Sequence, residues 1–101
     1  MFLMSEYIEI VHVDSYALDS LESMGGRNAA VARRIKSLVD EGGVHFHLGS
    51  LRRGYPDVPK DTQIIVGGGV WNICVKERAG NLRVAGYSDV RVDRSISFDI
   101  R

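Results

Sequence analysis

The sequence has a single cysteine and no excess of charge of either sign. With Cys74 alone, an internal disulfide and every metal motif built from several cysteines are excluded, and a reducing, cytoplasmic setting is expected. Thirteen basic residues balance thirteen acidic ones, so no global field attracts nucleic acid or an anionic membrane surface. Binding of that kind would need a local patch of charge.

Long apolar runs are also lacking. The opening MFLM places four apolar residues before Ser5, too few for the core of a signal peptide or for a membrane span. We expect residues 1–6 to be disordered and no contact with a membrane. The 101 residues, 45% of them hydrophobic, are enough for one modest core, which predicts a single domain over residues 1–101.

The first half of the chain predicts one strand and two helices. Residues 7–13, YIEIVHV, are rich in β-branched residues and alternate in the manner of a strand. Apolar residues then recur at helical spacing in SYALDSLESM, which ends at a glycine pair, and again from Asn28 to about Glu41, before a second glycine pair.

Beyond the second glycine pair, apolar residues alternate in every run, as they do in strands. Val44, Phe46 and Leu48 share one face, VWNICV follows three glycines, and residues 70–87 are predicted to form a hairpin. The last apolar residues also alternate, so residues 94–101 predict a C-terminal extension strand. The expected fold class is α+β: a strand, two helices, then an antiparallel β-meander, with the helices packed on one face of the sheet.

This order of elements resembles the RelE/ParE superfamily of small bacterial toxins, which includes the HigB group. The segments that carry the resemblance are the apolar residues of the first helix, the basic pair in VARRIKSLV, the glycine turn before an aromatic residue in IVGGGVWNICV, and the polar cluster in LRVAGYSDVR. The resemblance implies a metal-independent endoribonuclease, or a toxin with a protein target, and an antitoxin as partner. Two departures oppose this activity: the chain is neutral, and Asn72 stands where the family commonly has arginine.

Three residues are candidates for catalysis. Arg83, Tyr87 and Arg91 share the odd face of the predicted strands, where an aromatic hydroxyl beside two arginines could stabilise a transferring phosphate and supply a proton. The side chains of a solvated sheet face would show the same pattern, so both interpretations stay open.

A second basic cluster lies in the loop SLRRGYPDVPKD. Arg52, Arg53 and Lys60 are predicted to bind an anion, because guanidinium groups recognise phosphates and carboxylates and because loops on a rigid scaffold often carry binding groups. A solvated loop is the alternative.

No metal and no cofactor are predicted. His12, His45 and His47 could form a zinc site with an open fourth position, but three histidines without a matching carboxylate spacing are weak evidence for one. Gly67 to Gly69 lack the lysine and hydroxyl residue of a P-loop and precede a predicted strand, so a tight turn or bulge is expected there. Cys74 is interpreted as structural, since no helix N-terminus is predicted near it.

The C-terminal residues Ile96, Phe98 and Ile100 form an apolar ridge. The ridge either pairs with a second copy or another protein at an exposed sheet edge, which would allow a homodimer, or completes the core of the domain.

Two functions are therefore expected from the sequence. One is a RelE-like toxin that acts on RNA or on a protein through its arginine clusters. The other is a non-catalytic inhibitor or ligand-sequestering protein, of the kind that phages and mobile elements encode, which binds an anionic ligand such as a nucleotide or an acidic protein partner.

Overall fold

The computed structural model describes residues 6–99, and these residues form one four-stranded sheet in which every neighbouring pair of strands is parallel. The strand order is β2-β1-β3-β4. The strands are β1 (Glu6–Val11), β2 (Val44–His47), β3 (Gln63–Gly68) and β4 (Asp89–Ser97). The helices are α1 (Ser15–Ser23), α2 (Gly26–Asp40), a π-helical turn η1 (Trp71–Val75) and α3 (Lys76–Val84).

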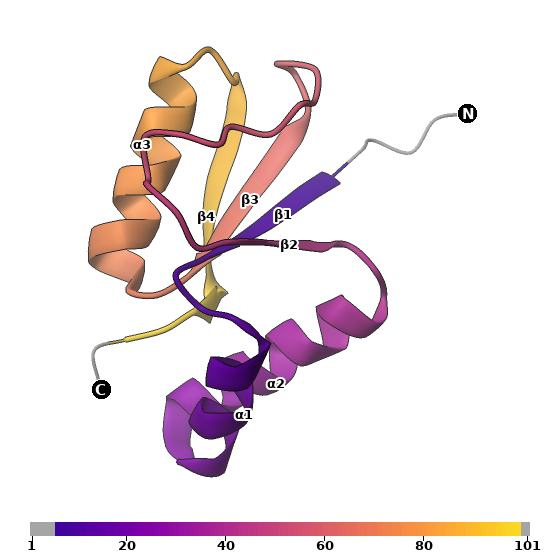
Figure 1. The fold of residues 1–101 in the computed structure, drawn as a ribbon, viewed down its shortest axis with the longest axis vertical. Helices are drawn as coiled ribbons and strands as arrows, with labels where there is room; N and C mark the ends of the chain where they lie inside the picture. The colour runs from indigo at the N-terminus through magenta and orange to yellow at the C-terminus, as the bar shows by residue number, and fades with distance from the viewer. Residues whose placement is uncertain (1–5, 100–101) are drawn as a thin grey trace.

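The helices lie on both faces of the sheet, with α1 and α2 on one side and α3 on the other (Figure 1). Parallel neighbours need a connection that returns the chain to the starting end of the sheet. Helices α1 and α2 supply this return between β1 and β2, and α3 supplies it between β3 and β4. Residues 48–62 connect β2 to β3 without a helix.

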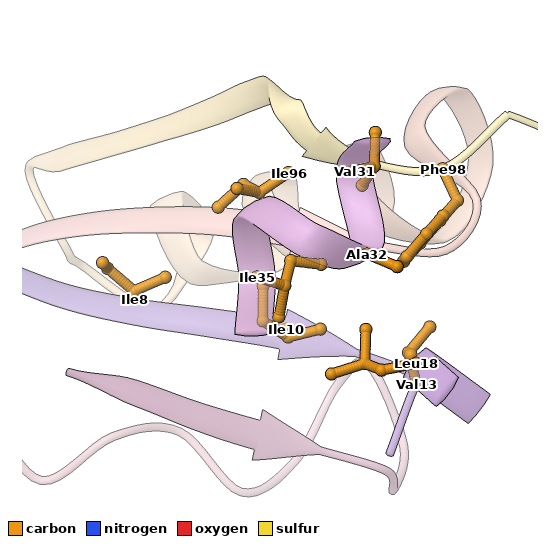
Figure 2. Close-up of a cluster of buried hydrophobic side chains, with 9 residues drawn as sticks. All are labelled: Ile8, Ile10, Val13, Leu18, Val31, Ala32, Ile35, Ile96 and Phe98. Atoms are coloured by element: carbon orange, nitrogen blue, oxygen red, sulfur yellow. The ribbon is translucent and has the colours of Figure 1, made fainter. Parts of the chain in front are cut away.

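Side chains alternate along each strand, so the two faces of the sheet contribute to two separate cores. Ile8 and Ile10 of β1 lie on the face covered by α1 and α2, in the same buried cluster as Val31 and Ile35 (Figure 2). The complete buried set is Ile8, Ile10, Val13, Leu18, Val31, Ala32, Ile35, Ile96 and Phe98. The opposite core, against α3, consists of Val11, Ile64, Val66, Val75, Ala79, Leu82, Tyr87 and Val90.

The first strand, the two helices after it and the strand at Val44 lie where the sequence pattern placed them. Asp14 caps α1, because its Oδ1 accepts a hydrogen bond of 2.9 Å from the Ala17 amide. No helix among residues 6–99 combines the length and the apolar character needed to cross a membrane.

The predicted antiparallel meander is wrong, and so is the hairpin over residues 70–87. Residues 71–84 are helical, and β3 and β4 are parallel neighbours on either side of this helix. The alternation of Trp71, Ile73 and Val75 suggested a strand, but Ile73 is about half exposed. The buried residues instead follow the helical spacing of Val75, Ala79 and Leu82.

The C-terminal part of the chain also differs from the expectation of a separate extension. Residues 94–97 are the end of the nine-residue strand β4. The pairing of β4 with β3 is irregular between Val66 and Gly68, which is the kind of bulge expected around the glycine run. Of residues 1–6, which were predicted to be disordered, Glu6 is instead the first residue of β1, and residues 1–5 lie outside the described residues, as does Ile100.

Candidate functional site at the carboxyl edge of the sheet

The three residues predicted to be catalytic lie near the amino end of β4, and each is engaged within the domain. Arg83 Nη2 donates to the Val90 carbonyl at 2.9 Å, and Arg91 Nε lies 3.1 Å from Asp89 Oδ1. Tyr87 is buried. Among residues 6–99, no hydrogen bond or ion pair joins the Tyr87 hydroxyl to either arginine.

The Tyr87 hydroxyl contacts the β2–β3 loop instead. It donates to the Pro56 carbonyl at 2.5 Å, and the ring centroids of Tyr55 and Tyr87 lie 6.4 Å apart. The Lys60 ammonium lies 4.0 Å from the Tyr87 ring centroid and donates to the Ala85 carbonyl at 3.2 Å. The structure therefore brings Tyr87 and the predicted anion-binding loop together, but through contacts that hold the loop in place.

The other two predicted anion-binding residues, Arg52 and Arg53, are exposed on that loop. Neither forms an ion pair within the described part of the chain. The Arg53 carbonyl accepts a hydrogen bond of 2.8 Å from Arg78, so the backbone of this basic turn is fixed while its side chains face solvent.

Arg78 of α3 was not among the site residues predicted from the sequence, yet its side chain fixes the β2–β3 loop through several hydrogen bonds. It is fully buried and forms a two-pronged ion pair with the buried Glu9 of β1, with Nε to Oε1 at 2.5 Å and Nη2 to Oε2 at 3.1 Å. Its remaining donors bind the carbonyls of Leu51, Arg53 and Gly54. Glu9 stands among apolar residues of a buried strand, and that pattern could have indicated a buried partner.

The acidic neighbour also affects Tyr7, two residues earlier in β1. Burial raises the pKa of the Tyr7 hydroxyl above its usual value of 10.0, and the negative charge of Glu9 raises it further. On the opposite side of the molecule, hydrogen bonds to Asp19 and Glu22 raise the pKa of the exposed Lys36 ammonium.

The three histidine side chains make different contacts, although the backbones of His12 and His47 are hydrogen-bonded neighbours. The His45 ring stacks on Tyr7 with 4.1 Å between ring centroids, and His47 Nε2 donates to the Ser50 carbonyl at 2.7 Å. His12 is exposed at the end of β1 and has a φ of 61°. Within residues 6–99, no group of three or more histidine, cysteine or acidic side chains is placed to hold a metal ion.

Two residues of the predicted interface ridge belong to the core. Ile96 is 1% exposed and Phe98 is 3% exposed, and both pack with α2 (Figure 2). Among the described residues, the ridge therefore supports the alternative of a strand that completes the domain.

The glycine run closes the carboxyl edge of the sheet. Gly68 has a φ of 109°, and a Cβ there would lie 2.3 Å from the Val11 carbonyl oxygen, so only glycine allows this approach of β3 to β1. The Gly69 amide donates to the Val11 carbonyl at 3.1 Å, and the Phe98 amide donates to the Gly68 carbonyl at 2.8 Å. The run thereby joins the ends of β1, β3 and β4.

A helical segment starts directly after the glycines, contrary to the prediction of a strand. Cys74 is partly buried and lies in η1, the first turn of this segment. The interpretation of Cys74 as structural assumed that no helix began nearby, and that assumption is wrong.

A hollow of about 420 Å³ lies beyond the carboxyl end of β4, where the turn from α1 to α2 meets the segment after β4. Its lining consists of Leu21, Met24, Gly25, Gly26, Arg27, Asn28, Phe98 and Asp99. Asn28 holds the wall in place, because its side chain both donates to the Asp99 carbonyl and accepts from the Asp99 amide.

Arg27 and Asp99 supply the charges of the lining, and Arg94 lies beside Asp99. Arg27 Nε lies 2.9 Å from one oxygen of Asp99, and Arg94 Nη2 lies 3.2 Å from the other, so two arginines share one carboxylate. The Arg94 guanidinium also lies 3.9 Å from the ring centroid of Trp71, and the Lys76 ammonium lies 4.7 Å from it. The sequence pattern predicted only that the glycine pair before Arg27 ends a helix. Gly25 and Gly26 also line the hollow beside Arg27, with open space where side chains would stand.

Comparison of the chain with protein-family models, curated proteins and solved structures finds no match.

Proposed function

We propose that this chain is a small ligand-binding protein whose site is the hollow at the carboxyl edge of the sheet. The ligand is a small molecule that combines an apolar part with one anionic group. This proposal keeps the ligand-binding function expected from the sequence but moves the site from the β2–β3 loop to the hollow between the α1–α2 turn and the segment after β4.

The observation that carries the proposal is the strand order β2-β1-β3-β4 in a parallel sheet. From β1 the chain passes over one face to β2, and from β3 it passes over the other face to β4. In sheets wound in this way, the connections diverge between the two central strands, and ligands bind outside the carboxyl ends of the strands. In this chain the central strands are β1 and β3.

The hollow lies one strand away, beyond the end of β4, and Phe98 connects it with that position. Gly69, at the end of β3, has Val13 and Phe98 as its nearest side-chain neighbours, at 3.6 and 4.0 Å from a Cβ built on it. Phe98 also lines the hollow. A ligand in the hollow would therefore rest against the residue that connects the ends of β3 and β4.

The lining has the composition of a small-molecule site. Leu21, Met24 and Phe98 supply an apolar surface, and Arg27 and Asn28 supply donors at one side. Small-molecule sites typically have volumes of roughly 300–1,000 Å³ and combine apolar walls with a few polar groups. Because Arg27 and Arg94 share a single carboxylate, an anionic group can bind Arg27 while Asp99 keeps its contact with Arg94.

A ligand-detected NMR screen tests the proposal. The library pairs small aromatic carboxylates and phosphates with neutral analogues of the same shape, and we expect the anionic members to bind preferentially. Arg27→Gln should weaken their binding about 10- to 100-fold, the loss expected for a hydrogen bond to a charged group. Arg33→Gln, on an exposed part of the same helix, serves as the control and should leave the affinity unchanged.

The variants also distinguish the two candidate anion sites. If Arg52→Gln/Arg53→Gln abolishes anion binding and Arg27→Gln does not, the site lies on the β2–β3 loop and the hollow is rejected. If no library member binds the wild-type protein more tightly than Arg27→Gln, the proposed site is wrong.

A further inference from the structure

Strand β2 is one edge of the sheet, and part of its backbone faces outward. The His12 amide donates to the His47 carbonyl at 2.9 Å, so the polar backbone groups of His47 point toward β1. Because these groups alternate in direction along a strand, those of Val44 and Phe46 point away from β1. The open edge therefore offers an N–H and a C=O from each of these two residues.

The two edges of the sheet differ in how they are protected. The opposite edge strand, β4, has the sequence DVRVDRSIS, with four charged side chains and an irregular register near its end. Charges and bulges are the features by which edge strands avoid pairing with other chains. The sequence of β2, VHFH, contains neither an acidic residue nor lysine, arginine or proline.

The surface beside β2 is suited to a second copy of the same chain. Val39 and Phe46 are 39% and 36% exposed and border a shallow hollow of about 140 Å³, which Lys36 and Asp40 also line. Lys36 is already bonded to Asp19 and Glu22 of its own chain, so the exposed apolar side chains of Val39 and Phe46 are what a two-fold axis at this edge brings together from the two copies. The chain has no net charge, so its copies do not repel one another.

We propose that β2 pairs antiparallel with β2 of a second copy, which joins two four-stranded sheets into one. Val44 of each copy faces Phe46 of the other, and each of these pairs exchanges two backbone hydrogen bonds. The α2 helices of the two copies then lie side by side on the same face of the joined sheet. The contact is small, so the dimer is weak and depends on protein concentration.

Light scattering and native mass spectrometry across a concentration series test this pairing. We expect a mass of 11.2 kDa in dilute solution and twice this mass at millimolar concentration. Phe46→Pro removes the outward N–H and should give a monomer at all concentrations. Phe46→Ala removes the same side chain but keeps the N–H, so it should retain a measurable dimer.

Hydrogen exchange supplies a readout that does not depend on the proline variant folding. In the wild-type protein, the Val44 and Phe46 amides should exchange more slowly as the concentration rises, whereas the His45 amide, which faces β1, should not change. The pairing is overturned by a monomeric mass at millimolar concentration, by a dimer that survives in folded Phe46→Pro, or by exchange rates independent of concentration. It is also overturned if Phe46→Ala is as monomeric as Phe46→Pro.

Discussion

Replacement of Arg78 by methionine should cause a large loss of stability. Methionine keeps much of the length and apolar volume of the arginine stem but leaves the Glu9 carboxylate buried without its partner. Three loop carbonyls also lose a donor. Loss of one member of a buried ion pair typically costs about 3–5 kcal/mol, a large share of the roughly 5–15 kcal/mol that stabilises a domain of this kind.

Urea unfolding followed by the fluorescence of Trp71, the single tryptophan, measures this cost. A loss of about 3 kcal/mol should also lower the melting temperature by about 12 °C or more. The exposed pair between Arg91 and Asp89 provides the control, because Arg91→Met removes an ion pair in solvent and should cost less than about 1 kcal/mol.

A double-mutant cycle tests the reason for the loss. Most of the cost in Arg78→Met comes from a buried charge, so Glu9→Gln/Arg78→Met should be more stable than Arg78→Met alone. The released loop should also become accessible, and trypsin should cleave after Arg52 and Arg53 faster in Arg78→Met than in the wild type. A loss below about 1 kcal/mol in Arg78→Met, or strict additivity in the cycle, would refute this explanation.

Three further predictions concern other contacts. Tyr87→Phe leaves the buried loop carbonyl without a donor and should cost about 1–3 kcal/mol in urea unfolding, whereas an unchanged midpoint would show that the bond contributes nothing. Gly68→Ala should lower the stability by about 3 kcal/mol or more, since its Cβ would meet the Val11 backbone and the residue has a φ of 109°. In α3, a Cβ at Gly80 meets nothing within 4 Å, so Gly80→Ala should raise the stability by about 0.5–1 kcal/mol. Equal effects of the two substitutions in thermal unfolding would contradict this. The raised pKa of Tyr7 means that folding favours the neutral form of its hydroxyl, so the unfolding free energy should fall as the pH rises above 10.0. This fall should be less steep in Tyr7→Phe, which has no hydroxyl to ionise. Parallel pH profiles of the two proteins would argue against this contribution.

Local patterns predicted the first half of the fold well. Helices α1 and α2 have the apolar spacing, the Asp14 cap and the glycine stops that define helices locally, so no tertiary information was needed to find them. Strand β1 has alternating residues on both faces, which fits a central strand covered on both sides.

The second half was predicted wrongly because two periods overlap in it. The residues that follow the glycine run alternate over one short stretch, whereas Val75, Ala79 and Leu82 repeat with the period of a helix. With the helix misassigned as a hairpin, two additional strands stood between β3 and β4, and the predicted sheet became an antiparallel meander. The direction of β3 relative to β2 was also missed, since both strands pair parallel with β1, which lies between them.

The sites were harder to predict than the fold, since charged and aromatic side chains serve two purposes in this chain. Tyr87, Lys60 and Arg78 have the residue types of a reactive cluster, yet each donates its polar hydrogens to backbone carbonyls in or beside the helix-free β2–β3 connection. A parallel connection without a helix leaves carbonyls that the connection itself cannot satisfy, and side chains must supply the donors. The face of the sheet that α3 covers thus uses these polar groups for structure. At the carboxyl end, backbone-to-backbone hydrogen bonds through the glycine run join the strand ends. Within residues 6–99, Arg27 uses Nε for Asp99 and Nη2 for the Arg94 carbonyl, so its Nη1 group remains for the proposed ligand.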